Sequence, residues 1–165
     1  MAETTTSRGG GGQYLTFFVG TEEYAAGILR IKEIIEFSGA TRVPGTPASV
    51  VGVINLRGRV VPVIDLAVKF GASRTVRTQR TCVVIVEIEL GGESTVMGLL
   101  TDSVSQVIDL PGDAIEPPPA FGTRARPDFL QGVGKNGDRF VLILDLDRLL
   151  TDQEINSIVS EPVAV

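Results

Sequence analysis

The sequence predicts an all-β protein made of two related lobes, each a small closed sheet, packed face to face. Its 165 residues contain many short apolar runs, rich in valine and isoleucine and separated by turn residues. This pattern is typical of barrels and sandwiches. A second observation is an internal repeat, in which positions 47–66 match positions 127–146. Average residue usage gives about one identity by chance, and seven are present: Pro47/Pro127, Gly52/Gly132, Val53/Val133, Arg59/Arg139, Val61/Val141, Asp65/Asp145 and Leu66/Leu146.

The chain begins with a lead over residues 1–12 that is rich in threonine and glycine. We expect this lead to be disordered, because it has no apolar periodicity. Strands are predicted over Gln13–Val19, Tyr24–Leu29 and Ile31–Phe37. The apolar residues of the third segment recur in a mixed pattern, which leaves a helix over Ile28–Glu36 as an alternative.

The clearest local signal is a hairpin, in which the apolar runs Val50–Leu56 and Val60–Ile64 flank Arg57-Gly58-Arg59. Gly58 can adopt the positive φ that a tight turn requires, and the two arginine side chains would then lie in water at the tip. Pro62 cannot donate a hydrogen bond to a ladder, so we expect its strand at a sheet edge or a bend.

Short helical turns are expected on both sides of this hairpin. Pro47 would occupy the first position of a turn through Val50, and Asp65 would cap a turn through Phe70. A polar loop over Ala72–Arg80 follows, and it carries Arg74, Arg77 and Arg80.

The second half of the chain is predicted to hold strands over Cys82–Leu90, Thr95–Thr101 and Val104–Leu110. A stiff connector of three prolines at 117–119 comes next. The segments Phe129–Val133 and Phe140–Leu144 form a second hairpin with Asn136-Gly137 at its tip. Thr151 and Glu154 make a capping box, which predicts a C-terminal helix over Asp152–Val159.

Composition excludes several classes of function. The single cysteine, Cys82, permits no internal disulfide and fits a reducing compartment. We find no secretory signal and no apolar run long enough for a membrane span, so a cytoplasmic protein is expected. A net charge of −5 argues against general nucleic-acid binding. The absence of histidine removes the commonest general base and a common zinc ligand, and no metal or cofactor is expected.

Some motifs suggest chemistry, and each has a simpler structural interpretation. Residues 132–137 match G-x-G-x-x-G, but a hairpin strand follows where a phosphate site needs a helix. Asp102 with Asp65 or Asp145 would be the carboxylate pair of a two-lobed, aspartic-type hydrolase. We favour turn and capping roles for these aspartates. Cys82 fits a core position, and the three arginines of the polar loop fit a solvated surface, because no aromatic residue is interleaved with them.

The central hairpin also carries a family resemblance. Thr46-Pro47, Gly52-Val53-Ile54-Asn55-Leu56-Arg57-Gly58 and Val60-Val61-Pro62-Val63-Ile64-Asp65-Leu66 resemble the hallmark of CheW-like chemotaxis adaptors. The resemblance implies two SH3-like, five-stranded β-barrel lobes on a shared core, with short helical turns and a C-terminal helix. The lobes would cover about residues 13–75 and 76–150, with the C-terminal helix and tail over 151–165.

The resemblance implies a non-enzymatic scaffold that couples chemoreceptors to the histidine kinase CheA. The receptor's helical tip would lie between the lobes, and the kinase's regulatory domain would bind mainly the first lobe. The protein would then reach the membrane only indirectly, through receptors. An adaptor of a chemosensory pathway unrelated to motility is an alternative. The family's receptor positions correspond to Ile31, Glu33, Gly52 and Arg57, and its kinase positions to Val43, Pro44 and Phe121.

Overall fold

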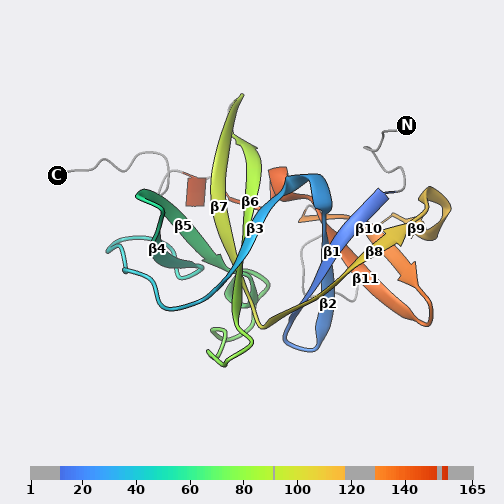
Figure 1. Ribbon diagram of the computed structural model, residues 1–165, viewed down its shortest axis with the longest axis horizontal. Coiled ribbons are helices and arrows are strands. Elements are labelled where there is room, and N and C mark those ends of the chain that lie inside the picture. Colours follow the sequence, from blue (N-terminus) through green and yellow to red (C-terminus); the bar gives the residue numbers. More distant parts are fainter. Residues whose placement is uncertain (1–11, 91, 118–128, 152–153, 156–165) are drawn as a thin grey trace.

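Two curved sheets make up the molecule in the computed structural model, which describes residues 12–90, 92–117, 129–151 and 154–155 (Figure 1). The first half of the chain supplies β1 (Gly12–Val19), β2 (Glu22–Gly27), β3 (Ile31–Glu36), β4 (Val50–Leu56), β5 (Arg59–Asp65) and α1 (Leu66–Lys69). The second half supplies β6 (Cys82–Leu90), β7 (Glu93–Thr101), β8 (Ser103–Leu110), β9 (Ile115–Glu116), β10 (Leu130–Asn136) and β11 (Arg139–Leu144).

Each sheet takes strands from both halves of the chain. The six-stranded sheet, which we call lobe A, has the order β8-β1-β2-β11-β10-β9. The five-stranded sheet, lobe B, has the order β3-β6-β7-β5-β4. The predicted fold class of two SH3-like lobes is confirmed, but the predicted lobe boundary near residue 75 is wrong. The N-terminal hairpin β1–β2 completes lobe A by pairing with β8 and β11, while β6–β7 completes lobe B.

The internal repeat corresponds to the two hairpins β4–β5 and β10–β11, one in each lobe. The ladder of each hairpin shifts register at the same place, between Val50 and Gly52 in one and between Leu130 and Gly132 in the other. The second strand of each hairpin then runs parallel to a strand from a distant part of the chain, β5 to β7 and β11 to β2. The lobes are therefore related in structure as well as in sequence.

The core is shared between the lobes. Its largest buried cluster joins residues of both sheets, including Phe17 and Tyr24 from lobe A and Val86 and Leu99 from lobe B. A smaller cluster fills the interior of each lobe, around Ile143 in lobe A and in lobe B around Val63, Val83 and Ile85. Successive side chains of a β-strand point to opposite faces of its sheet. In β6, one set of side chains therefore packs inside lobe B and the other set packs in the core shared with lobe A.

The structure decides between the open alternatives along β3. Residues Ile31–Glu36 form a strand, and the helical tendency before it is limited to a 3-10 turn over Ile28–Arg30. Pro62 was expected at a sheet edge or a bend, and the edge alternative is wrong because β5 lies between β7 and β4. The parallel ladder with β7 begins only at Val63, so Pro62 has no pairing partner on that side.

The predicted caps have mixed outcomes. Asp65 caps α1 by accepting a hydrogen bond from the Ala67 amide. Asp145 makes no such bond to the equivalent 3-10 turn. The capping box is confirmed, because the Thr151 amide donates to the Glu154 carboxylate over 2.9 Å and the Glu154 amide donates to the Thr151 hydroxyl over 3.2 Å. Most of the predicted C-terminal helix and two of the three connector prolines lie outside the described residues.

Candidate functional site

An ion pair joins the tip of the β4–β5 hairpin to β3. The guanidinium of Arg57 donates to both carboxylate oxygens of Glu33, with one nitrogen–oxygen distance of 3.3 Å and a second, closer contact. Hydrogen bonding to Glu33, with the charge of that carboxylate, raises the pKa of Arg57. The Arg57 side chain is nevertheless 73% exposed, so its stacking face and remaining donors are available to a partner.

The hairpin tip holds Arg57 in a defined place. Arg57 and Gly58 both have positive φ, 52° and 86°, which is the geometry of the type I′ turn common in two-residue hairpin loops. The side chain of Asn55 accepts a hydrogen bond of 2.7 Å from the Gly58 amide and stabilises this turn. The sequence indicated the positive φ of Gly58 but not that of Arg57.

Gly52, on the same strand that leads to the hairpin tip, lies where the two edges of the lobe B sheet meet. The strands β3 and β4 are the two edges of the lobe B sheet, and Thr41, in the segment after β3, forms a bridge with Val53 through two backbone bonds of 2.8 Å. A Cβ on Gly52 would lie 2.2 Å from the Thr41 carbonyl oxygen, and the φ of Gly52 is +148°. Gly52 is buried, so it supports the site through the backbone rather than by touching a partner.

Ile31 is partly buried and packs against the shared core. Two exposed apolar residues, which the sequence did not single out, lie on the same side of the two sheets. Ile34 on β3 pairs with Val84 of β6, and Val107 on β8 pairs with Leu15 of β1. Their partners both belong to the shared core, and β3 and β8 occupy equivalent places in the two lobes.

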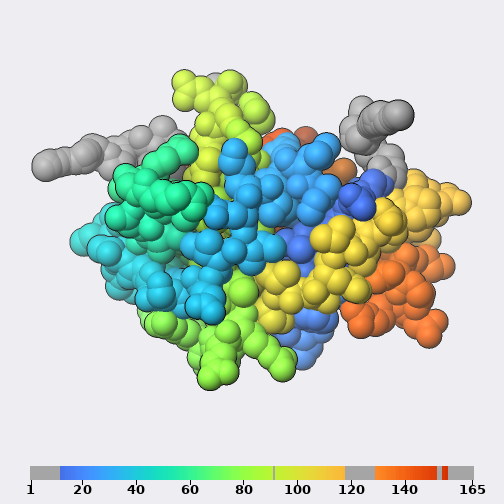
Figure 2. Space-filling model, in the orientation of Figure 1, coloured from blue at the N-terminus to red at the C-terminus, as the bar shows by residue number. Residues whose placement is uncertain are grey.

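Ile34 is 42% exposed and Val107 is 49% exposed. Figure 2 shows the strands that carry them on one face of the molecule. The internal repeat in the sequence did not reveal this pair. Ile34 and Val107 lie outside the repeated hairpins, where the two halves of the chain no longer match at a constant spacing.

The predicted kinase positions Val43 and Pro44 lie in the connection between β3 and β4. The Thr46 hydroxyl donates to the Val43 carbonyl over 2.8 Å, and Gly45 has a φ of +81°. Proline followed by a glycine with positive φ is the pattern of a type II turn. Phe121 lies outside the described residues.

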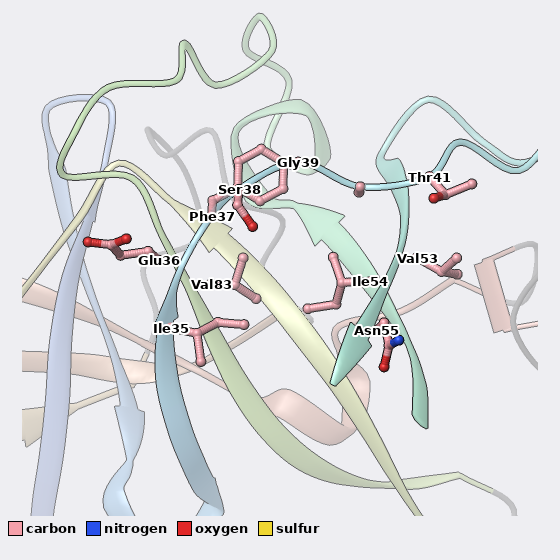
Figure 3. A pocket seen from close by; sticks show the side chains of 11 residues that line it. Ile35, Glu36, Phe37, Ser38, Gly39, Thr41, Val53, Ile54, Asn55 and Val83 are labelled. Atoms are coloured by element: carbon pink, nitrogen blue, oxygen red, sulfur yellow. The ribbon is translucent and has the colours of Figure 1, made fainter. Parts of the chain in front are cut away.

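A cleft of about 500 Å³ opens between β3 and β4, where the Thr41 bridge and the Glu33–Arg57 ion pair connect the two edges of the lobe B sheet. Its floor is apolar: Figure 3 shows Ile35, Ile54 and Val83 turned toward one another. The same connection that carries Val43 and Pro44 supplies Ser38, Gly39 and Thr41 to the rim.

The aspartates of the hydrolase alternative have structural roles. Asp65 is buried, and its two oxygens accept hydrogen bonds from Ala67 and Thr75. Asp102 accepts from the Gly20 amide over 2.6 Å, and Asp145 lies 4.0 Å from Arg148. None of the contacts among the described residues joins Asp102 to Asp65 or Asp145.

Cys82 is partly exposed at the start of β6 rather than in the core, and burial of the thiol raises its pKa. Within the described residues, no cluster of carboxylates and cysteine is suited to hold a metal ion. No helix in the part of the chain that the structure describes is long and apolar enough to cross a membrane.

Comparison with known proteins gives consistent matches. A family model described as the CheW-like domain matches residues 13–154. The chain is 35% identical over 145 residues to the chemotaxis protein CheW of Klebsiella aerogenes, covering 88% of this chain and 85% of that protein. It is 36% identical over 138 residues to the chemotaxis protein CheW of Helicobacter pylori, covering 84% of this chain and 81% of that protein.

A solved structure also matches. The crystal structure of the scaffolding protein TtCheW from Thermoanaerobacter tengcongensis superimposes with a TM-score of 0.77 at 32% sequence identity. The match covers 87% of this chain and 95% of that chain, so both lobes are included.

Proposed function

The chain belongs to the CheW-like domain family, and from this premise we propose that it is a non-enzymatic adaptor that couples chemoreceptors to the histidine kinase CheA. The names of its relatives support a role in chemotaxis, and the description of the similar solved structure supports a scaffolding role. The observation that carries the proposal furthest is the exposed Glu33–Arg57 pair, which a rigid hairpin presents at the surface.

The receptor would bind as a helix lying across the surface near β3. Ile31 and Ile34 on β3 supply apolar area, and Val107 extends that area onto lobe A. Helices bind such surfaces through apolar residues at regular spacing. Arg57, whose planar guanidinium suits carboxylates and helix C-termini, fixes the orientation of the bound helix. Gly52 contributes by keeping the edges of lobe B together.

The regulatory domain of the kinase would bind lobe B near Val43 and Pro44. The neighbouring cleft, which has a polar rim and apolar side chains on its floor, supports this proposal because it offers concave area beside a preformed turn. Phe121 remains a proposed second contact on the sequence alone. Transient interfaces of this kind bury about 1,200 Å² or less and bind in the micromolar range.

The experiment is a calorimetric titration with a receptor cytoplasmic fragment and, separately, with a CheA regulatory domain. We expect Arg57→Ala to weaken receptor binding roughly tenfold, because a charge-assisted hydrogen bond at an interface is lost. Binding of the kinase domain should stay unchanged. The matched control is Arg59→Ala, which removes an exposed arginine of the same hairpin for which the described residues show no ion pair.

The titrations distinguish an error about Arg57 from an error about the function of the protein. Equal receptor affinity for the wild type and a folded Arg57→Ala protein would remove Arg57 from the receptor site. Failure of the wild-type protein to bind either partner from the same organism would overturn the proposed function.

A further inference from the structure

Residues 72–80, which we call the basic loop, form an unusual surface for a chain with a net charge of −5. The loop connects α1 to β6, and Arg74, Arg77 and Arg80 are all exposed. None of the three makes an ion pair with any residue that the structure describes. In Figure 2 the loop projects from the lower edge of the molecule, apart from the β4–β5 hairpin.

Three anchors hold the basic loop in one shape. The buried carboxylate of Asp65 accepts hydrogen bonds from the Thr75 amide over 2.9 Å and from the Thr75 hydroxyl over 2.7 Å. The Thr78 amide donates to the Thr81 hydroxyl over 2.8 Å. The Arg77 guanidinium lies 5.6 Å from the centre of the Phe37 ring, a distance at which a cation is attracted to the ring.

This rigidity distinguishes the basic loop from an ordinary solvated segment. A flexible loop loses conformational entropy when a partner orders it, whereas a preorganised one loses less. The loop therefore holds the arginines in place for contact, and none of the three guanidinium groups is engaged in an ion pair with a described residue.

The composition of the loop indicates which kind of anion it suits. Val76 lies among the arginines and is 75% exposed, and an exposed apolar residue among charges is typical of contacts between proteins. A membrane or a nucleic acid would present dense negative charge to a protein that is itself negative, which is unfavourable at long range. Carboxylates on a protein partner bring less charge and match the guanidinium fork.

We propose that the basic loop is a separate docking surface for a carboxylate-rich segment of a protein partner. Arg74 and Arg80 pair with carboxylates, Arg77 does so while it is supported by Phe37, and Val76 contacts the apolar part of the partner. The surface does not depend on the Glu33–Arg57 site, so its test can fail or succeed independently of the proposed function.

The test uses NMR of the full ¹⁵N-labelled protein titrated with a hexaglutamate peptide at low salt. We expect amide shifts centred on residues 72–81. The variant Arg74→Gln/Arg77→Gln/Arg80→Gln should bind the peptide about tenfold more weakly, because it loses three exposed ion pairs. The variant removes the Arg77–Phe37 contact, but the hydrogen bonds of Thr75 and Thr78 are untouched. We therefore expect it to keep the circular dichroism spectrum and slow exchange at the Thr75 amide.

A charge-matched control removes three other exposed cations, in the variant Arg42→Gln/Arg59→Gln/Lys135→Gln. Retained binding by this control would support the proposal, and an equal loss in both variants would overturn it, because net charge alone would then explain the binding. Shifts spread over the whole surface, or no shifts at millimolar peptide, would also overturn it. Loop shifts with phosphatidylglycerol vesicles but not with the peptide would identify a membrane surface instead and reject a protein partner.

Discussion

A buried ion pair fastens the beginning of the C-terminal segment to the rest of the molecule. The Lys69 ammonium at the end of α1 lies 2.6 Å from a Glu154 carboxylate oxygen, and the two side chains are 3% and 5% exposed. Ser49 donates to the other carboxylate oxygen, and the ammonium lies 4.3 Å from the centre of the Phe129 ring. We predict that Glu154→Gln is among the most destabilising polar substitutions in the protein.

The magnitude follows from the burial of Lys69. Without the Glu154 carboxylate, the ammonium would remain in an apolar setting with no opposite charge. Removal of one partner of a buried ion pair costs about 3–5 kcal/mol, which is a large part of the roughly 5–15 kcal/mol that stabilises a typical domain. The corresponding fall in Tm is about 6–20 °C.

The assay is urea unfolding followed by circular dichroism. The double variant Lys69→Met/Glu154→Gln is the control, because it removes the buried charge together with its partner. We expect this variant to recover most of the lost stability, since replacing both members of a buried ion pair is often nearly neutral. A loss below about 1 kcal/mol in Glu154→Gln would refute the reasoning, as would a double variant less stable than the single one.

The same pair predicts a pH dependence. Burial raises the pKa of Glu154, but hydrogen bonds from Lys69, Ser49 and Thr151 outweigh burial and leave the pKa below its usual value. A carboxyl group with a lowered pKa stabilises the folded state above its unfolded pKa, and this contribution is lost as the pH falls through the folded value. Stability should therefore decline below about pH 4.5, and less steeply in the double variant.

Two further predictions concern backbone support. Gly52→Ala should cost about 3 kcal/mol or more in urea unfolding, because its Cβ would lie 2.2 Å from the Thr41 carbonyl oxygen. The control is Gly58→Ala, where an added Cβ meets no other atom and only the positive φ is unfavourable, so we expect a cost of about 1–2 kcal/mol. Equal losses of stability in the Gly52 and Gly58 variants would contradict this explanation. Asp65→Asn should speed hydrogen exchange at the Thr75 amide and cost about 1–3 kcal/mol, because one acceptor of the basic loop is lost. Unchanged exchange would show that other contacts order the loop.

Local features were predicted well because their causes are local. The β4–β5 hairpin follows from its glycine turn and apolar runs, and the caps at Asp65 and Thr151 follow from side-chain chemistry within a few residues. The repeat correctly indicated two related lobes. The resemblance selected Glu33 and Arg57, which the structure brings into contact, although their roles in binding stay predictions.

Long-range pairing could not be predicted in the same way. Nothing in residues 13–27 indicates that β2 runs parallel to β11, because no turn connects them and apolar strands of this kind are interchangeable in sequence. The same difficulty explains the error at Pro62, whose strand is covered on one side by β7 from a later segment. Gly52 was assigned to receptor binding by resemblance, and only the Thr41 backbone shows why this position requires glycine.

The exchange of hairpins between the lobes has a consequence for biosynthesis. β2 ends at Gly27 and β11 begins at Arg139, so roughly 110 residues are translated before lobe A can close. At about 5–20 residues per second, β2 waits about 5–20 s for β11, whereas the outer partner of β1, β8, is translated earlier. Lobe B is complete at Thr101, well before the last strands emerge. Translation therefore favours an order of events in which the lobe in the middle of the gene folds first and serves as the template on which both ends of the chain assemble.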